Sequence, residues 1–134
     1  MKLYLAAQYA RRKELVNYAV QLRAAGHEIT SRWLTGVHKA DDGDTSRWRD
    51  FAEEDFADIQ ESDILIAFTE RATDAIPRGS RHMELGIALG LNKFVVVVGP
   101  RENVFCALAL VLHYPTWNDF VVSWLMQSAG GQHV

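Results

Sequence analysis

The chain has 134 residues and a mass of 15.1 kDa, the size of one compact domain, and 49% of its residues are hydrophobic, enough for a packed core. Fourteen Lys and Arg against 17 Asp and Glu give a formal net charge of −3, which argues against a protein that binds a nucleic-acid backbone. A mononucleotide ligand is not excluded, because roughly two or three local cations suffice for one phosphate.

The only cysteine, Cys106, forbids an internal disulfide, and no signal-peptide pattern follows Met1. The longest apolar run is too short to span a membrane. We therefore expect one cytoplasmic domain over residues 1–134.

Short β-branched runs alternate with longer helical patterns, which indicates a parallel α/β sheet. For residues 103–112 the sequence pattern predicts a short helix followed by a short edge strand. The other predicted strands cover residues 3–7, 27–33, 64–68 and 94–98. The predicted helices cover residues 11–25, 48–61, 80–91 and, capped by Thr116, about 116–127.

This order fits a three-layer flavodoxin-like or Rossmann-like sandwich, with a five-stranded, mainly parallel sheet and helices on both faces. Such sheets bind their ligands beyond the carboxyl ends of the strands. The unusual polar residues follow the predicted strands and lie in residues 7–12, 33 onward, 69–84 and 99–103. We expect the site at that edge of the sheet.

The densest polar cluster begins a predicted helix. Gly79 permits a tight turn, and Ser80 starts a helix whose free N–H groups attract an anion such as a phosphate. Arg78 and Arg81 could add charge-assisted hydrogen bonds to that anion. Glu84 lies one turn into the helix, where it could be a nucleophile, a base or a surface residue that compensates the helix dipole.

A second candidate is Asp55, on the helix predicted at residues 48–61. A helix that runs antiparallel to the strands brings its first half close to their carboxyl ends, so Asp55 can face the pocket. Its acidic neighbours are typical of a solvated helix face. Asp63 is interpreted as structural, because it ends the turn before a strand.

The first strand and its loop supply further candidates. Tyr4 lies within the strand, where a core tyrosine is the ordinary interpretation. Gln8 and Tyr9 lie in the loop, and Arg12 begins the next helix, where a cation opposes the dipole and could serve an anionic ligand. Trp33 ends the second strand and is the best candidate for stacking on a base.

The histidines have no spacing that builds a metal site with Cys106 or a carboxylate, so we predict no metal and no cofactor.

With these residues placed, the chain resembles the nucleoside 2-deoxyribosyltransferase-like family, which includes the 2'-deoxynucleoside 5'-phosphate N-hydrolases. The resemblance covers nearly the whole length and rests on residues 3–6, 55–68 and 79–90. Residues 55–63 are similar to the family's helix with a substrate-orienting aspartate, and residues 82–88 to the segment with its catalytic glutamate.

The resemblance implies cleavage of a glycosidic bond in a nucleoside or nucleotide. Glu84 would attack the anomeric carbon and form a covalent glycosyl-enzyme, which water or a second base then resolves. Asp55 would hold a sugar hydroxyl or protonate the departing base, and Tyr4 would orient Glu84. Because only the carboxylate attacks, we expect a normal or depressed pKa for Glu84.

The cations near the helix start favour a nucleoside 5'-monophosphate, with Arg78, Ser80, Arg81 and Arg12 around the phosphate. The family also builds its site at a subunit interface, so the resemblance implies a homodimer or higher homo-oligomer. Asn103 is the candidate for the polar residue that a neighbouring subunit supplies.

Three alternatives stay open. The enzyme could be a transferase that moves the sugar to a second base. The chain could be a nucleotide-binding domain without turnover. It could also be a partner-binding domain whose last predicted helix presents an apolar stripe made of Trp117, Phe120, Val121 and Trp124.

Overall fold

The computed structural model describes residues 1–36, 45–70 and 79–129. Within these residues the strands are β1 (Lys2–Ala6), β2 (Glu28–Ile29), β3 (Ile64–Phe68), β4 (Phe94–Val98) and β5 (Val111–Tyr114). The helices are η1 (Tyr9–Arg11), α1 (Arg12–Ala24), η2 (Arg32–Thr35), α2 (Trp48–Glu61), α3 (Ser80–Gly90), η3 (Val104–Ala107), α4 (Trp117–Phe120), η4 (Val121–Leu125) and α5 (Met126–Ala129).

The strands form one sheet in the order β2-β1-β3-β4-β5, and every neighbouring pair is parallel. The chain moves outward from β1 to β2, then crosses back to β3 on the other side of β1. This reversal places a topological switch point between the carboxyl ends of β1 and β3, where such folds bind ligands. The expected α/β sandwich is confirmed.

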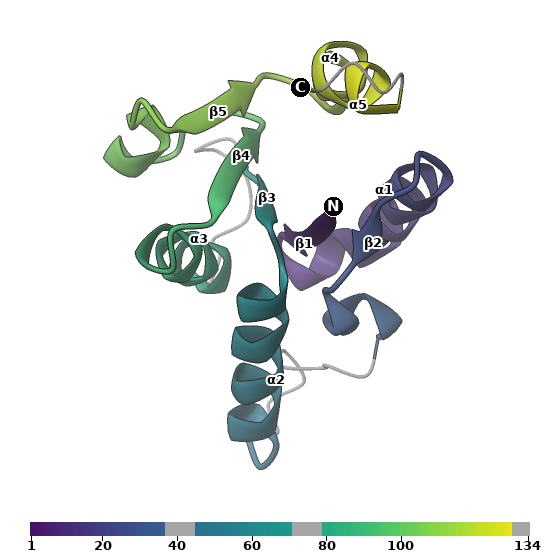
Figure 1. Cartoon of the computed structure of the whole chain (residues 1–134). Helices are drawn as coiled ribbons and strands as arrows, with labels where there is room; N and C mark the ends of the chain where they lie inside the picture. The colour runs from purple at the N-terminus through teal and green to yellow at the C-terminus, as the bar shows by residue number, and fades with distance from the viewer. Residues whose placement is uncertain (37–44, 71–78, 130–134) are drawn as a thin grey trace.

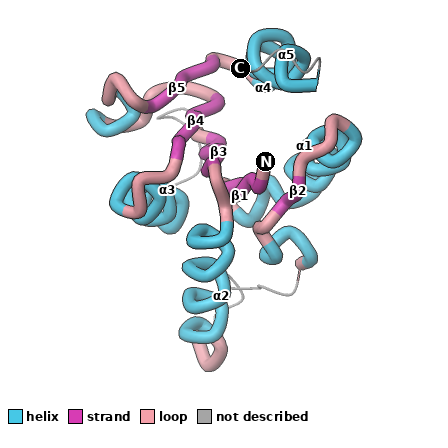
Figure 2. The backbone as a smooth tube through the Cα atoms, in the orientation of Figure 1, coloured by secondary structure: helices cyan, strands magenta, loops and turns pink. Residues whose placement is uncertain are grey.

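Helices cover both faces of the sheet (Figure 1). α1 and the C-terminal helical segment lie on one face, and α2 and α3 lie together on the other (Figures 1 and 2). The helices α2 and α3 flank the switch point on their side of the sheet, so their facing sides border the expected site.

The core lies along the central strands. Every residue of β3 is buried, as are the last four residues of β1 and of β4. Their sequences are nearly continuous apolar runs, as expected for parallel strands that are covered on both faces. This rigid centre holds the strand ends from which the site residues project.

Several elements differ from the prediction: β5 extends two residues beyond the predicted end at 112, and the short helix η1 was not predicted. The second strand keeps only Glu28 and Ile29, because the chain turns at once into the 3₁₀-helix η2 (Figure 2). The last helix begins at the predicted cap, where Thr116 Oγ1 accepts the Asp119 N–H at 3.1 Å, but it passes through a π-helical turn, η4. The predicted loop at residues 35–44, the loop at 69–79 and the C-terminal tail fall largely outside the described residues.

No helix in the described part of the chain is long and apolar enough to cross a membrane.

Candidate active site

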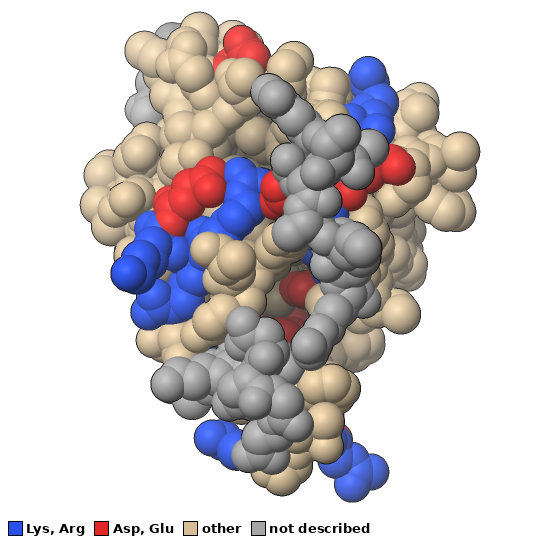
Figure 3. Space-filling model, turned by 180° about the vertical axis from the view of Figure 1, so that it is seen from behind, with Lys and Arg blue, Asp and Glu red and all other residues tan. Residues whose placement is uncertain are grey.

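A pocket of about 400 Å³ lies on the seam between α2 and α3. The space-filling view shows a hollow with acidic atoms at its floor (Figure 3). Its lining is mostly apolar, with two carboxylates. The lining residues are Ala52, Asp55, Phe56, Ile59, Gly79, Ser80, Met83, Glu84 and Ile87.

Helical periodicity explains why these residues meet. On α3, Ser80, Met83, Glu84 and Ile87 follow the i, i+3, i+4, i+7 spacing of one helix face, while Arg81, Leu85 and Ala88 form the buried face. On α2, the pocket residues repeat with the same spacing from Ala52 to Ile59. Asp55 and Glu84 therefore approach each other from opposite walls, as predicted for a helix antiparallel to the strands.

Glu84 lies partly buried, and its Oε2 has no exposed surface and no hydrogen-bond partner among the described residues. Burial raises the pKa of Glu84 to about 8; the Tyr4 hydroxyl counters this rise, and the charge of Asp55 adds to it. The prediction of a normal or depressed pKa was therefore wrong. It overlooked the desolvation caused by the apolar walls.

Tyr4 projects from β1 and is completely buried. Burial, and then the nearby carboxylates of Glu84 and Asp55, raise its pKa well above the usual value, so the hydroxyl keeps its proton. The Tyr4 hydroxyl lies close enough to Glu84 to affect its pKa, although no described residue completes a hydrogen bond of standard geometry with Tyr4 Oη. This places a neutral donor beside the Glu84 carboxyl group.

Three groups that can hold or exchange a proton lie around one space. A buried carboxyl group carries one oxygen without a partner, a hydroxyl lies beside it, and a second carboxylate faces the same space. A carboxyl group that loses its proton there becomes a poorly solvated, nucleophilic carboxylate, and the second carboxyl group can carry a proton. Among the described residues, no group of three His, Cys, Asp or Glu side chains is placed to hold a metal ion.

The start of α3 differs from the predicted phosphate site. Arg81 is only 3% exposed, and its Nη2 atom lies 2.7 and 2.6 Å from the two carboxylate oxygens of Glu102. Its guanidinium is thus committed to a protein carboxylate, which argues against the predicted phosphate contact. Gly79 precedes the helix with a left-handed φ of 88°, and Ser80 is exposed at the pocket. Arg78 lies outside the described residues.

Arg12 lies at the start of α1, beyond the carboxyl end of β1. Its Nη2 donates to the Thr35 carbonyl at 3.3 Å, while its Nε is buried and has no partner among the described residues. Gly36, with φ of 88°, lets the guanidinium approach closely, since a Cβ there would lie 2.7 Å from Arg12 Nη2. The Arg12 side chain is therefore held next to the chain that follows β2.

Two other predicted contacts, Trp33 and Tyr9, have structural roles. Trp33 is 5% exposed and donates from Nε1 to the Leu5 carbonyl at 2.7 Å, so its ring belongs to the core, contrary to the predicted stacking on a base. Tyr9 donates to the Gly36 carbonyl at 3.1 Å and packs beside Trp33. Gln8 precedes η1 in extended conformation, without a side-chain cap.

Asn103 is engaged within its own chain. Its Oδ1 accepts the Phe105 N–H at 2.9 Å, and its Nδ2 lies 3.3 Å from His82 Nδ1. The structure thus connects Asn103 to the first turn of α3.

Glu102 and Glu70 were not among the predicted site residues. Glu102 contacts Arg81 in the first turn of α3, and Glu70 contacts Arg11 before α1. Both follow central strands, at the edge where polar residues were expected, but nothing in their spacing pointed to Arg81 or Arg11.

Asp63 donates from its N–H to the Lys2 carbonyl at 2.7 Å, and its Oδ2 accepts the Lys2 N–H at 2.8 Å. This contact lies at the opposite end of the sheet and confirms the structural interpretation of Asp63.

No family model and no curated protein matches the sequence. Solved structures do match, and they define the fold as that of the nucleoside-processing proteins which the sequence resembles.

One is the 2-deoxyribosyltransferase of Bacillus psychrosaccharolyticus, with a TM-score of 0.68 and 24% identity over 89% of both chains. Another is the CMP N-glycosidase of Clostridium botulinum, with a TM-score of 0.59 and 19% identity over 91% of this chain and 96% of the other. At these identities the likeness is one of fold.

Proposed function

We propose that this chain is a cytoplasmic N-glycosidase that cleaves a ribo- or deoxyribonucleoside 5'-monophosphate into a free base and a sugar phosphate. The proposal rests on one observation. The Glu84 carboxyl group, with an unpartnered buried oxygen, lies beside the Tyr4 hydroxyl and across the pocket from Asp55.

The first step is attack of a Glu84 carboxylate oxygen on the anomeric carbon. The carbon–nitrogen bond to the base breaks, its electron pair goes to the base, and Asp55 supplies the proton that the leaving base takes up. The high pKa of Glu84 means that the resting site holds a proton near neutral pH. Transfer of that proton to Asp55 on substrate binding would prepare the nucleophile and the acid together.

The second step is hydrolysis of the glycosyl ester. Asp55 accepts a proton from water, the water oxygen bonds to the anomeric carbon, and the bond to Glu84 breaks. Two displacements at one carbon retain its configuration. The Tyr4 hydroxyl would stabilise the Glu84 carboxylate when it is released.

A phosphate at the 5' position is supported by the edge of the site. α3 is an eleven-residue helix that begins with Gly79 and exposed Ser80 at the pocket, and its N-terminus favours an anion. Arg12, which begins α1 beyond the carboxyl end of β1, is the cation we assign to this phosphate. The glycosidase with the same fold is named for CMP, which is a 5'-monophosphate.

We also propose that the domain, residues 1–134, acts as a homodimer or higher homo-oligomer. Several large apolar side chains are exposed on β4, β5 and the intervening segment, which is typical of a surface covered by another protein. They are Phe94, Val104, Phe105, Leu108, Leu110 and Leu112.

A transferase is the second candidate, because the other neighbour is a 2-deoxyribosyltransferase. It would use the same first step, and a second base would replace water in resolving the intermediate.

A chromatographic assay of free base tests the proposal. Nucleosides and their 5'-monophosphates are incubated with the protein, with and without a second base, beside a folded Glu84→Ala variant. Base release from monophosphates without an acceptor supports the N-glycosidase, whereas release that requires an acceptor indicates the transferase. Full activity of Glu84→Ala contradicts the assigned nucleophile, and no release from any substrate favours a binding domain without turnover.

A further inference from the structure

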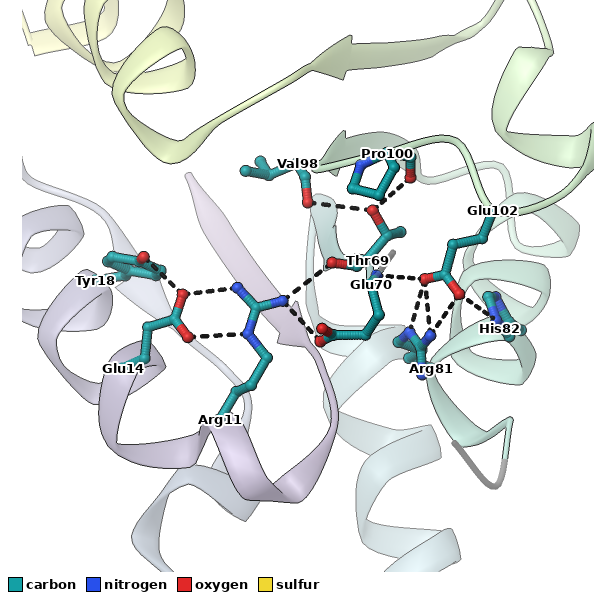
Figure 4. Close-up of polar contacts among 10 residues, drawn as sticks. All are labelled: Arg11, Glu14, Tyr18, Thr69, Glu70, Arg81, His82, Val98, Pro100 and Glu102. Atoms are coloured by element: carbon teal, nitrogen blue, oxygen red, sulfur yellow. Dashed lines mark hydrogen bonds and ion pairs between the residues drawn. The ribbon is translucent and has the colours of Figure 1, made fainter. Parts of the chain in front are cut away.

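One carboxylate, that of Glu102, contacts the residues on both sides of segment 71–78 (Figure 4). On one side, its Oε1 accepts the Glu70 N–H at 2.7 Å, just after β3. On the other, both of its oxygens accept hydrogen bonds from Arg81 in the first turn of α3. Glu102 itself follows β4, so it joins three parts of the chain at the carboxyl edge of the sheet.

The first turn of α3 has two further contacts with the loop that follows β4. His82 Nε2 lies 3.5 Å from Glu102 Oε2, and His82 Nδ1 lies 3.3 Å from Asn103 Nδ2. Hydrogen bonds from Arg81 and the Glu70 backbone lower the pKa of Glu102 despite its partial burial, so the carboxylate stays charged.

The network continues toward β1. Arg11 donates to the Glu70 carboxylate at 2.9 Å and to the Thr69 carbonyl at 3.2 Å, and it forms two hydrogen bonds with Glu14 (Figure 4). The residues after β3 are thus held from the β1 side by Arg11 and from the β4 side by Glu102.

We propose that Glu102 is a positioning residue that fixes the start of α3 and thereby the place of Glu84 in the pocket. The inference rests on the proposed role of Glu84. Arg81 precedes Glu84 by three positions, so the two side chains belong to the same helical turn. A shift at the start of α3 would move Glu84 relative to Tyr4 and Asp55, which lie on other elements.

A buried ion pair contributes little net stability compared with well-packed apolar residues of similar size. Apolar side chains could replace the packing of Arg81 and Glu102, but they could not accept the Glu70 N–H or fix the rotation of the helix. This difference separates a positioning role from a merely structural one.

The test compares Glu102→Gln and the double variant Arg81→Met/Glu102→Leu with wild type. Leu22→Ala, a core change on α1, is the matched destabilised control. Base release gives kcat and KM, and carbon-13 NMR of labelled glutamate gives the titration midpoint of Glu84, assigned by its absence in Glu84→Gln. Thermal unfolding gives stability, and all comparisons are made below the unfolding temperature of each variant.

We expect Glu102→Gln to lower kcat by roughly 10- to 100-fold with a smaller change in KM, because a misplaced nucleophile affects the chemical step most. In Glu102→Gln the titration midpoint of Glu84 should move to lower pH as water reaches the carboxyl group. Leu22→Ala should leave both kcat and the Glu84 midpoint unchanged. The double variant should recover stability relative to Glu102→Gln, while its kcat stays low.

A wild-type kcat and an unmoved Glu84 midpoint in Glu102→Gln would overturn the proposal, as would recovery of kcat in the double variant. If wild type releases no base from any substrate, the proposed function fails. The Glu84 midpoint still tests the positioning role in that case.

Discussion

At the scale of single residues, the site is defined by the burial of Glu84. A carboxyl group in an apolar pocket favours its neutral form, whereas attack on a sugar needs the charged form. The protein therefore holds a group whose resting state differs from its reactive state. Two neighbours oppose each other, since the Tyr4 hydroxyl lowers the pKa of Glu84 and the Asp55 charge raises it.

This opposition gives a prediction for the pH dependence of kcat/KM, which reports the free enzyme. The reactive form holds one proton shared between Glu84 and Asp55, so activity should fall as pH rises through about 8, where the site loses that proton. Tyr4→Phe removes the group that lowers the pKa, so the fall should shift to higher pH. Asp55→Asn removes the acid that takes up the Glu84 proton, so its residual activity should instead rise with pH as Glu84 ionises, with a midpoint below the wild-type value because the charge that raises the pKa is gone. Asp63→Asn, at the opposite end of the sheet, is the control that should leave the profile in place; a wild-type activity that rises through pH 8, or a fall that shifts to lower pH in Tyr4→Phe, would contradict this account.

The same burial predicts a stability change in Glu84→Gln. Because the pKa of Glu84 is raised from 4.5 to about 8 on folding, the native state binds more protons than the unfolded chain between these values, and stability falls as pH rises through them. Glutamine removes this loss. We expect the variant to unfold roughly 5–10 °C higher than wild type at pH 8 and at the same temperature near pH 4. Calorimetry at the two pH values measures it, and equal unfolding temperatures at pH 8 would show that Glu84 is well solvated.

At the scale of elements, the seam between α2 and α3 explains which site residues the sequence could predict. Asp55 and Glu84 were predictable because helical spacing and the direction of the helices bring both toward the carboxyl edge. The roles of Arg81 and Trp33 were not predictable. The partner of Arg81, Glu102, comes from a loop that is distant in the sequence. The residues around Trp33 form no pattern that distinguishes an indole packed in the core from one that stacks on a ligand base.

The two arginines at this edge should therefore behave differently. Arg12→Ala should raise KM for a 5'-monophosphate about tenfold more than KM for the matching nucleoside, because one charge-assisted contact to the phosphate is lost. Arg81→Ala leaves the Glu102 carboxylate without its partner, so it should destabilise the fold and affect both substrates alike. Steady-state kinetics on substrate pairs measure this. A phosphate-selective effect of Arg81→Ala alone would restore the role expected from the sequence.

At the scale of the whole molecule, a run of aromatic rings joins the C-terminal segment to the rest of the fold. Trp117 stacks on Tyr18 of α1 at 4.1 Å between ring centroids and lies against Phe68 of β3. Phe120 stacks between Trp117 and Trp124, each with centroids 5.1 Å away. The apolar stripe of the last predicted helix is thus largely core packing, which weakens the alternative of a partner-binding domain.

This packing predicts that Phe120→Ala lowers the free energy of unfolding by about 3–5 kcal/mol, since a fully buried ring is replaced by a cavity. Val122→Ala, in the same segment but exposed, should change it by less than about 0.5 kcal/mol. Urea unfolding of both variants provides the comparison. Similar small losses in the two would mean that the C-terminal segment packs only loosely.

The fold itself was largely predictable, because β3 and β4 are continuous apolar runs that only central parallel strands require. The shortened β2 and the π-helical turn η4 were not, since both depend on how the chain packs at its ends. Local propensity is weak at such positions and tertiary contacts decide the backbone.

The central claim is that Glu84 bonds covalently to the sugar. Mass spectrometry of protein quenched during turnover of a 5'-monophosphate tests it directly. The account predicts a peptide containing Glu84 that carries the added mass of the sugar phosphate, absent from Glu84→Gln. Sustained base release without any such adduct, together with inversion at the anomeric carbon, would contradict it.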